Sequence, residues 1–343
     1  MIAVEKNHTH SDTLVRVSAP ARLHLGFLDL NGNSGRKFGS IGIAINSYCT
    51  TISAQTATQI SVHGFNNDEP LAARTLAIID KFYRSLGNGI AERDRGVAIT
   101  LEQLIPEHSG FGSGTQLNLA IGSALCRLHN INKSTQEIAA ELGRGARSGI
   151  GISTFDLGGF IIDGGLSSSS TVPPLLAHYN LPKDWRIVLI MDPHHQGVHG
   201  QQEKHAFKTL PTFPQQHANT ICHLTLMQLL PAIVEQKIEP FGDAITQIQS
   251  LIGDHFSPAQ GGRYTSPLIG QLLEKAQQLG HSGIAQSSWG PTGCIFVAND
   301  EQAQSLISTL TIVSQALADA NQQPNFQIAQ ANECGAKIEM TQV

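Results

Sequence analysis

The sequence lacks the features that mark secreted, membrane-bound and disulfide-stabilised proteins. Its five cysteines are odd in number, widely scattered and without paired metal-ligand spacing, which predicts reduced thiols. The polar stretch up to Asp12 contains no apolar signal core, and the apolar run at 224–234 is too short to span a bilayer. We therefore expect a cytoplasmic protein with no membrane partner.

Basic residues are also few. The chain has 22 lysines and arginines against 27 aspartates and glutamates, a net charge of -5, which argues against a nucleic-acid partner. A highly anionic ligand would need cations gathered in one place. With 343 residues, of which 41% are hydrophobic, the chain exceeds the usual size of a single core, and we expect two domains.

A glycine-rich loop that opens onto an amphipathic helix, at residues 105–128, is the most informative local pattern. Gly110, Gly112 and Gly114 lack a Cβ, so the main chain can approach a ligand closely. The helix that starts near Thr115 aims free N–H groups at the same place. The pattern predicts an anion site, and a plain connector is the alternative. No Gly-Lys-Ser or Gly-Lys-Thr occurs, and the glycine spacing departs from the dinucleotide fingerprint.

Hydrophobic periodicity divides the chain into two mixed halves. In the first half, apolar or alternating runs predict a helix at 71–86 and strands at 14–18, 22–28, 42–53, 59–63 and 97–104. Ser134 and Glu137 form a capping box that starts another helix. Residues 149–165 are interpreted as short strands joined by turns.

The stretch SSSSTVPP at 167–174 combines small, polar and proline residues, which places the domain boundary there. The predicted domains are residues 1–174 and 175–343. In the second, we expect helices near 216–235, 241–252, 267–279 and 301–318, and strands at 186–192, 293–298 and near Phe326 and Ile338. The fold class is α+β.

Three separated segments resemble the motifs of one superfamily. They are APARLHLGFLDLNG at 19–32, the loop and helix at 105–128, and SSWGPTGCIFV at 287–297. Together they are similar to the three motifs of the GHMP superfamily, named for galactokinase, homoserine, mevalonate and phosphomevalonate kinases. The resemblance implies a two-domain α+β, GHMP-kinase-like fold whose middle motif wraps a ligand's phosphates. Trp289 and Pro291 interrupt the glycine-rich third motif of the kinases.

A closer resemblance is to the β-ribofuranosylaminobenzene 5'-phosphate synthases of methanopterin biosynthesis. It is carried by RLHLGFLDLNG at 22–32 and by the segments at 143–165, 196–207 and 331–339. The resemblance implies a glycosyltransferase that joins phosphoribosyl diphosphate to para-aminobenzoate and releases CO2 and diphosphate. It implies a divalent cation, Mg2+, and no ATP, and it leaves a homodimer open. An ATP-dependent GHMP small-molecule kinase is the alternative, and a phosphate-ligand sensor without turnover is a third.

The implied reaction has chemical requirements that the residues can meet. Departure of diphosphate from the anomeric carbon builds oxocarbenium character, which favours a metal ion and oriented N–H donors at the leaving group. CO2 departs where aromatic substitution normally expels a proton, so no strong base is needed. The chain shows no persuasive nucleophile–base–orienter triad.

The phosphate contacts are expected from the glycine loop, whose Ser113 and Thr115 hydroxyls can donate at the helix start. Arginine suits bidentate anion binding. Arg144 and Arg147 can equally neutralise a helix C-terminus, and Arg22 can be an exposed strand-face charge. The basic candidates are Arg22, Arg36, Lys37, Arg144 and Arg147.

The catalytic candidates are Arg147 and two aspartates. Asp156 matches by position the acidic residue that superfamily kinases use near the transferred phosphate, and a turn or capping role is its alternative. Asp29 and His24 alternate on opposite faces of a strand. We favour Asp29 as close to substrate and His24 as a half-buried structural residue.

Metal ligands are not fixed by the sequence. Asp156 and Glu203 are the candidates, and an exposed helix-face charge is the simpler account of Glu203. Glu107 precedes the glycines, where a carboxylate near phosphate would want an intervening cation. The cluster of His194, His195 and His199 has no cysteine or HExxH partner, which argues against zinc.

Overall fold

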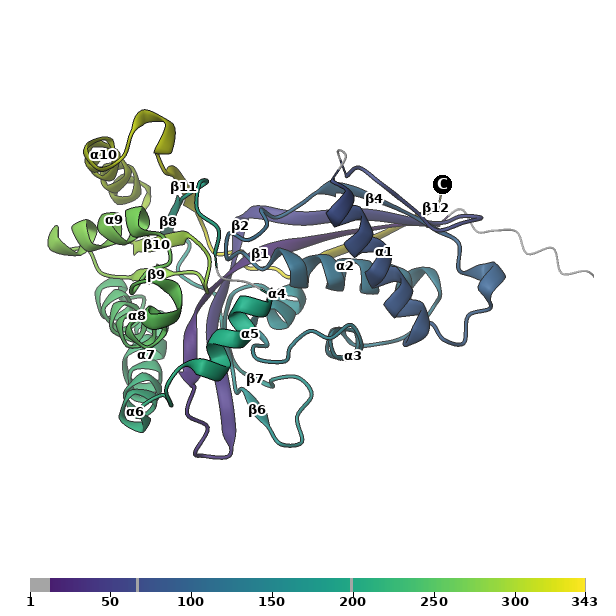
Figure 1. The fold of residues 1–343 in the computed structure, drawn as a ribbon, viewed down its shortest axis with the longest axis horizontal. Coiled ribbons are helices and arrows are strands. Elements are labelled where there is room, and N and C mark those ends of the chain that lie inside the picture. The colour runs from purple at the N-terminus through teal and green to yellow at the C-terminus, as the bar shows by residue number, and fades with distance from the viewer. Residues whose placement is uncertain (1–12, 66–67, 198–199, 343) are drawn as a thin grey trace, which may run out of the picture.

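The computed structural model describes residues 13–65, 68–197 and 200–342. The chain forms an elongated molecule with one large sheet and its helices in one half, and a smaller sheet enclosed by helices in the other (Figure 1). This confirms the two-domain α+β expectation. No helix in the described ranges is both long and apolar enough to cross a lipid bilayer.

The large sheet is built on two long strands, β1 (Thr13–Asp29) and β2 (Arg36–Thr56). The strand order is β12-β1-β2-β4-β3, with β12 (Lys337–Gln342), β4 (Val97–Gln103) and β3 (Ser61–His63). The sequence predicts two strands where β1 runs without a break. Register shifts after Pro20 and after His24 mark the irregularities in that strand.

Helices α1 (Glu69–Arg84), α2 (Ser113–Leu128), α3 (Thr135–Glu141) and α4 (Ile150–Leu157) belong to this half (Figure 1). The predicted capping box at Ser134 and Glu137 is confirmed. The prediction of short strands at 149–165 is wrong for α4. This helix is buried along most of its length and carries no polar stripe, so the helical period is invisible in its sequence. Strand β5 (Phe160–Asp163) follows it.

The small sheet has the order β11-β8-β10-β9. The strands are β8 (Arg186–Met191), β9 (Ile284–Gln286), β10 (Thr292–Val297) and β11 (Asn325–Ala329). Alternate residues of β8 pack on opposite layers, since Ile187 and Leu189 join one core cluster and Val188 and Ile190 another. Burial on both faces explains the continuous apolar run of this strand.

Helices cover both faces of the small sheet. On one side lie α6 (Gln215–Leu224), a π-helical turn (Thr225–Leu229), α7 (Leu230–Val234) and α8 (Ile238–Gln260), which share a core with the large sheet. On the other lie α9 (Pro267–Gln278) and α10 (Asp300–Leu317). These helices match the predicted positions.

The strand pairing does not divide the chain at the predicted boundary. Strand β7 (Leu175–Tyr179) pairs with β5 and therefore extends the large sheet beyond residue 174. Strand β12 pairs with β1 from Thr13↔Gln342 to Ser18↔Lys337 and returns the chain to the first domain. The serine- and proline-rich stretch at 167–174 is therefore a turn within the first domain. The second domain is an insertion between β7 and β12.

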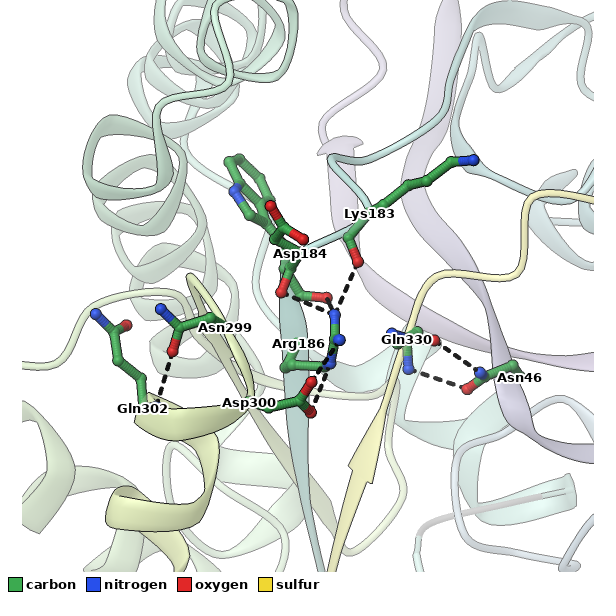
Figure 2. A network of polar contacts seen from close by, with 9 residues as sticks. Asn46, Lys183, Asp184, Arg186, Asn299, Asp300, Gln302 and Gln330 are labelled. Atoms are coloured by element: carbon green, nitrogen blue, oxygen red, sulfur yellow. Dashed lines mark hydrogen bonds and ion pairs between the residues drawn. The ribbon is translucent and has the colours of Figure 1, made fainter.

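A polar network ties the two sheets together away from the glycine loop (Figure 2). The main-chain N–H of Asn46, in β2, donates to the carbonyl of Gln330 at 3.1 Å, and the N–H of Gln330 donates to Oδ1 of Asn46 at 3.0 Å. Nearby, Arg186 donates to both carboxylate oxygens of Asp300 at 2.7 and 2.5 Å. The Asn46–Gln330 bonds hold β2 against the segment that follows β11, and the Arg186–Asp300 pair joins β8 to α10 within the second domain.

Asp163, at the end of β5, is fully buried and positions the start of α4. Its carboxylate accepts N–H bonds from Gly149 at 2.7 Å and Gly165 at 2.9 Å. Burial raises its pKa to about 6. A raised pKa in the folded state means that the stabilisation is present at low pH and is lost as pH rises through 6.

Asp163→Asn should therefore destabilise the protein most at acid pH. We expect the difference in unfolding free energy between wild type and Asp163→Asn to narrow as pH rises from about 5 to about 8. Over that range the wild-type protein loses stability as Asp163 ionises, whereas asparagine does not ionise. Urea unfolding at several pH values measures it. A difference that is constant with pH would show that the Asp163 carboxyl does not titrate in this range.

Candidate active site

The glycine loop has the conformation that the sequence predicts. Gly110 and Gly112 have φ of +85° and +83°, in the left-handed region that favours glycine. Gly112 is the N-cap of α2 and no side chain caps the helix, so its first-turn N–H groups face outward unclaimed by a cap. The loop is held from the second domain, since Ser287 Oγ donates to the Gly110 carbonyl and Thr292 Oγ1 to the Ser109 carbonyl, both at 2.7 Å.

A cavity of about 270 Å³ opens at this loop, and we call it the loop cavity. Three arginines from different elements line it: Arg22 from β1, Arg74 from α1, and Arg144 from the segment between α3 and α4. Glu107, Glu203 and Trp289 complete much of the wall. The cations that an acidic protein needs for an anionic ligand are therefore gathered here.

In the free protein, burial makes the charged forms of these arginines unfavourable. Burial lowers the pKa of Arg22 to about 10, and burial together with the charge of Arg74 lowers the pKa of Arg144. Nε of Arg144 is buried without a hydrogen-bond partner, although buried polar groups are usually paired. An anion between these side chains would relieve the repulsion and supply the missing acceptor.

A second cavity of about 290 Å³, which we call the Arg147 cavity, adjoins the first. The two share Arg22, Thr115, Arg144, Glu203 and Ser288 in their walls. The Arg147 cavity adds the segment 143–148, His24 and Phe27. Arg147 forms an ion pair with Glu203 at 2.9 Å, and its guanidinium lies 4.7 Å from the centre of the Phe207 ring.

The structure brings most of the predicted site residues together. Those that line one or both cavities are Arg22, Gly110, Gly112, Ser113, Gly114, Thr115, Arg144, Arg147 and Glu203. Glu203 lies on α5 (Gly200–Thr209) and is a half-buried ion-pair partner, so the simpler account of it as an exposed helix-face charge is wrong. Arg36 lies elsewhere and donates to the Gly164 and Gly165 carbonyls at 2.7 and 2.9 Å.

The two predicted catalytic aspartates are not among the residues that line these cavities. Oδ1 of Asp29 accepts the N–H groups of Asn31 and Gly32 at 2.7 and 3.0 Å and closes a turn. Asp156 accepts a hydrogen bond from Thr135 near the C-terminal end of α4. The N-terminal end of that helix, at Gly151, faces the Arg147 cavity instead.

The sequence does not mark several of the lining residues as ligand contacts, among them Arg74, His24 and Trp289. Arg74 lies on an otherwise ordinary amphipathic helix, and no local pattern distinguishes it. His24 was assigned a structural role, yet it contributes to the Arg147 cavity. The register shift after His24 breaks the simple alternation of faces on which that assignment rested. Trp289 was noted only as an interruption of a motif.

In the free protein the two carboxylates of the loop cavity are paired with arginines, Glu107 with Arg74 at 2.5 Å and Glu203 with Arg147 at 2.9 Å, and they would exchange these partners for a magnesium ion shared with a substrate. Glu107 and Glu203 line the loop cavity with the hydroxyls of Ser113 and Thr115, and Mg2+ takes such oxygens together with substrate phosphates. Within 13–65, 68–197 and 200–342 no group of three or more His, Cys, Asp or Glu side chains could hold an ion by itself. His199, part of the histidine cluster, lies outside the described residues.

The fold and the loop together define the class of protein. Residues 73–159 match the model of the GHMP kinases N-terminal domain, and residues 229–313 match that of the GHMP kinases C-terminal domain. The homoserine kinase structure from Cytophaga hutchinsonii superposes with a TM-score of 0.66 over 99% of both chains at 18% identity. At that identity the likeness shows the fold alone, which is the GHMP-kinase fold.

Relatives at higher identity narrow the class. The chain is 30% identical to the β-ribofuranosylphenol 5'-phosphate synthase of Methanothermobacter thermautotrophicus, over 83% of this chain and 89% of the relative. It is 33% identical to the enzyme of the same name from Archaeoglobus fulgidus, over 84% and 89%. The chain belongs to the β-ribofuranosylphenol 5'-phosphate synthase family, and the expectation of a synthase in the GHMP superfamily is confirmed.

Proposed function

We propose that the protein condenses phosphoribosyl diphosphate with a para-substituted benzoate, releasing CO2 and diphosphate. The observation that carries the proposal is the pair of adjoining cavities, whose walls contain a glycine loop and four arginines together with Phe27 and His24. One ligand with two phosphorylated ends and a second with an aromatic ring match these two kinds of wall. The sequence analysis predicts para-aminobenzoate, and the relatives' name points to the para-hydroxy acid.

The diphosphate end of the donor is assigned to the loop cavity. There the N-terminus of α2, Arg22, Arg74 and Arg144 can take up the negative charge that develops as the bond to the anomeric carbon breaks. Glu107 and Glu203 would hold Mg2+, which supplies charge neutralisation at the leaving group when bound. The sugar's other phosphate is assigned to Arg147 and Ser148 in the adjoining cavity.

The balance of the reaction needs no proton transfer at the reacting carbons. The leaving diphosphate oxygen takes the electron pair of the C–O bond, and the ring carbon that bears the carboxylate forms the new C–C bond. The electrons of the bond to the carboxyl carbon restore the aromatic ring as CO2 departs. This chemistry needs side chains that position the two substrates and neutralise the charge of the leaving diphosphate. The residues that line the cavities can do both.

One assay tests the proposal and separates it from the kinase alternative. Purified protein is incubated with Mg2+, phosphoribosyl diphosphate and carboxyl-labelled para-aminobenzoate or para-hydroxybenzoate. We expect labelled CO2 and diphosphate in equal amounts with at least one acid. Absence of both products would overturn the synthase, and ATP-dependent phosphorylation of a small alcohol would favour the kinase. We assign the reaction to a cytoplasmic route to methanopterin.

Two variants test the catalytic candidates against each other. Arg147→Ala should lower turnover by about 10- to 100-fold, because it removes a cation from the Arg147 cavity. The melting temperature should change little, since a half-exposed ion pair contributes about 1 kcal/mol or less. Asp156→Asn should stay within about threefold of wild type because the carboxylate bonds Thr135 away from both cavities. A large loss in Asp156→Asn alone would restore the catalytic role that the sequence analysis gives it.

A further inference from the structure

The walls of the two cavities combine arginines with aromatic side chains. His24 and Phe27 line the Arg147 cavity, and their ring centroids lie 4.7 Å apart. The ring centroids of Phe207 and Phe256 lie 6.1 and 6.4 Å from that of Phe27, and the Phe256 ring packs 4.6 Å from Trp289. The packed cluster gives Phe27 a rigid position, so the aromatic wall is preformed for a planar ring.

His24 carries a polar atom that the protein does not use. The residue is 5% exposed, and its Nε2 is buried without a hydrogen-bond partner. Most buried side-chain polar atoms in folded proteins have a partner, and an unpaired one points to a missing group. Nε1 of Trp289, which lines the loop cavity, is also buried and unpaired.

The chemistry of Nε2 limits what that missing group can be. Burial and the charges of Arg22 and Arg147 lower the pKa of His24 to about 3, so the imidazole is neutral near pH 7. In the tautomer that carries its proton on Nδ1, Nε2 presents a lone pair. It can accept an N–H or O–H bond, and it repels the oxygens of a carboxylate or a phosphate. A narrow cavity of about 20 Å³ bordered by His24 and Trp289 has room for about one water molecule.

We propose that His24 determines the specificity for the acceptor, with Nε2 accepting an N–H or O–H bond from the para substituent while the aryl ring packs against Phe27. This inference rests on the proposed function. The reacting ring carbon lies opposite the para substituent. Anchoring the substituent at His24 therefore turns the carboxyl-bearing carbon toward the sugar held by the arginines. A benzoate bound the other way round would place its carboxylate against a lone pair.

Two substitutions at His24 separate the hydrogen bond from packing. His24→Phe keeps an aromatic ring against Phe27 but removes the acceptor. It should raise KM for para-aminobenzoate about tenfold, the factor expected from one lost hydrogen bond, while kcat changes less than about threefold. His24→Gln retains a side-chain acceptor and should recover KM to within about threefold of wild type. KM for phosphoribosyl diphosphate should be unchanged in both.

Substrate analogues provide the second arm. Para-dimethylaminobenzoate keeps an electron-releasing nitrogen but has no N–H to donate. Wild type should bind it about tenfold more weakly than para-aminobenzoate, and this preference should disappear in His24→Phe, whose pocket cannot sense the N–H. An equal preference in wild type and His24→Phe would overturn the proposal, as would an equal rise in both Michaelis constants.

Equilibrium binding makes the inference independent of turnover. Calorimetric titration with para-aminobenzoate measures ring binding directly. Binding of para-aminobenzoate that weakens in His24→Phe, with no CO2 released by wild type, would support His24 and overturn the proposed reaction. Binding that is equal in wild type and His24→Phe, with normal CO2 release, would support the proposed reaction and overturn the role of His24. No binding and no release would overturn both.

Discussion

Gly114→Ala should lower turnover about 100-fold while the melting temperature stays the same or rises slightly. A Cβ at this position would lie 2.6 Å from Nη2 of Arg144, so the guanidinium must move out of its place in the loop cavity. Loss of a charged contact of this kind reduces binding of an anion by two or more orders of magnitude. The flexible end of an arginine can move at little cost to folding. Gly114 lies in the first turn of α2 outside the left-handed region, where alanine is the better helix former.

Steady-state kinetics and calorimetric titration with phosphoribosyl diphosphate measure the effect. Gly89→Ala is the matched control because a Cβ there meets nothing within 4 Å and φ is not left-handed. The control should leave both affinity and turnover unchanged. If Gly114→Ala bound the donor as tightly as wild type, the glycine loop would be a connector and Arg144 would not contact the ligand.

Arg22→Met should weaken donor binding by about 100-fold or more and leave the fold intact or more stable. Burial lowers the pKa of Arg22 to about 10, which means that the free protein holds this charge unfavourably. Methionine keeps much of the apolar stem and removes the charge. The Gly110 carbonyl, to which Arg22 donates, still accepts the Ser287 hydroxyl at 2.7 Å. We therefore expect affinity for phosphoribosyl diphosphate to fall by about 100-fold or more.

Thermal unfolding and calorimetry on the same preparation distinguish the outcomes. Arg16→Met, on the same strand, is the control, since Arg16 is an exposed residue that pairs with Glu102 at 2.7 Å far from the loop. It should affect neither donor affinity nor turnover. Retained donor affinity in Arg22→Met would exclude Arg22 from the binding site, and a large fall in melting temperature would show that its role is structural.

The sequence predicts the parts of the site that depend on neighbours in the chain. Gly110, Gly112 and Gly114 form a local pattern with a local consequence, and the helix that follows needs no tertiary information. Most helices and strands of the second domain are predicted for the same reason. For Arg144 and Arg147 the sequence does not distinguish a ligand contact from a structural role, because a helix C-terminus attracts arginine equally well.

The rest of the site depends on contacts between distant residues. Arg74 reaches the loop cavity only because α1 packs beside α2, and nothing near it in the sequence records that packing. A register shift follows His24 in β1, so the simple alternation of strand faces does not predict which way its side chain points. Asp156 shows the opposite failure, since a match by position gives it a role while α4 carries it past the cavity. Helical geometry separates Gly151 and Asp156 by more than one turn.

The return of β12 to β1 sets an order of events during synthesis. Residues 13–18 leave the ribosome long before their partners at 337–342. Until then one edge of β1 has no partner, and an open edge is a template for pairing with another chain. The inserted domain must emerge before that edge closes. A nascent chain stalled after β11 would therefore be prone to association, and cells that make this protein have reason to shield it with a chaperone until the last strand is in place.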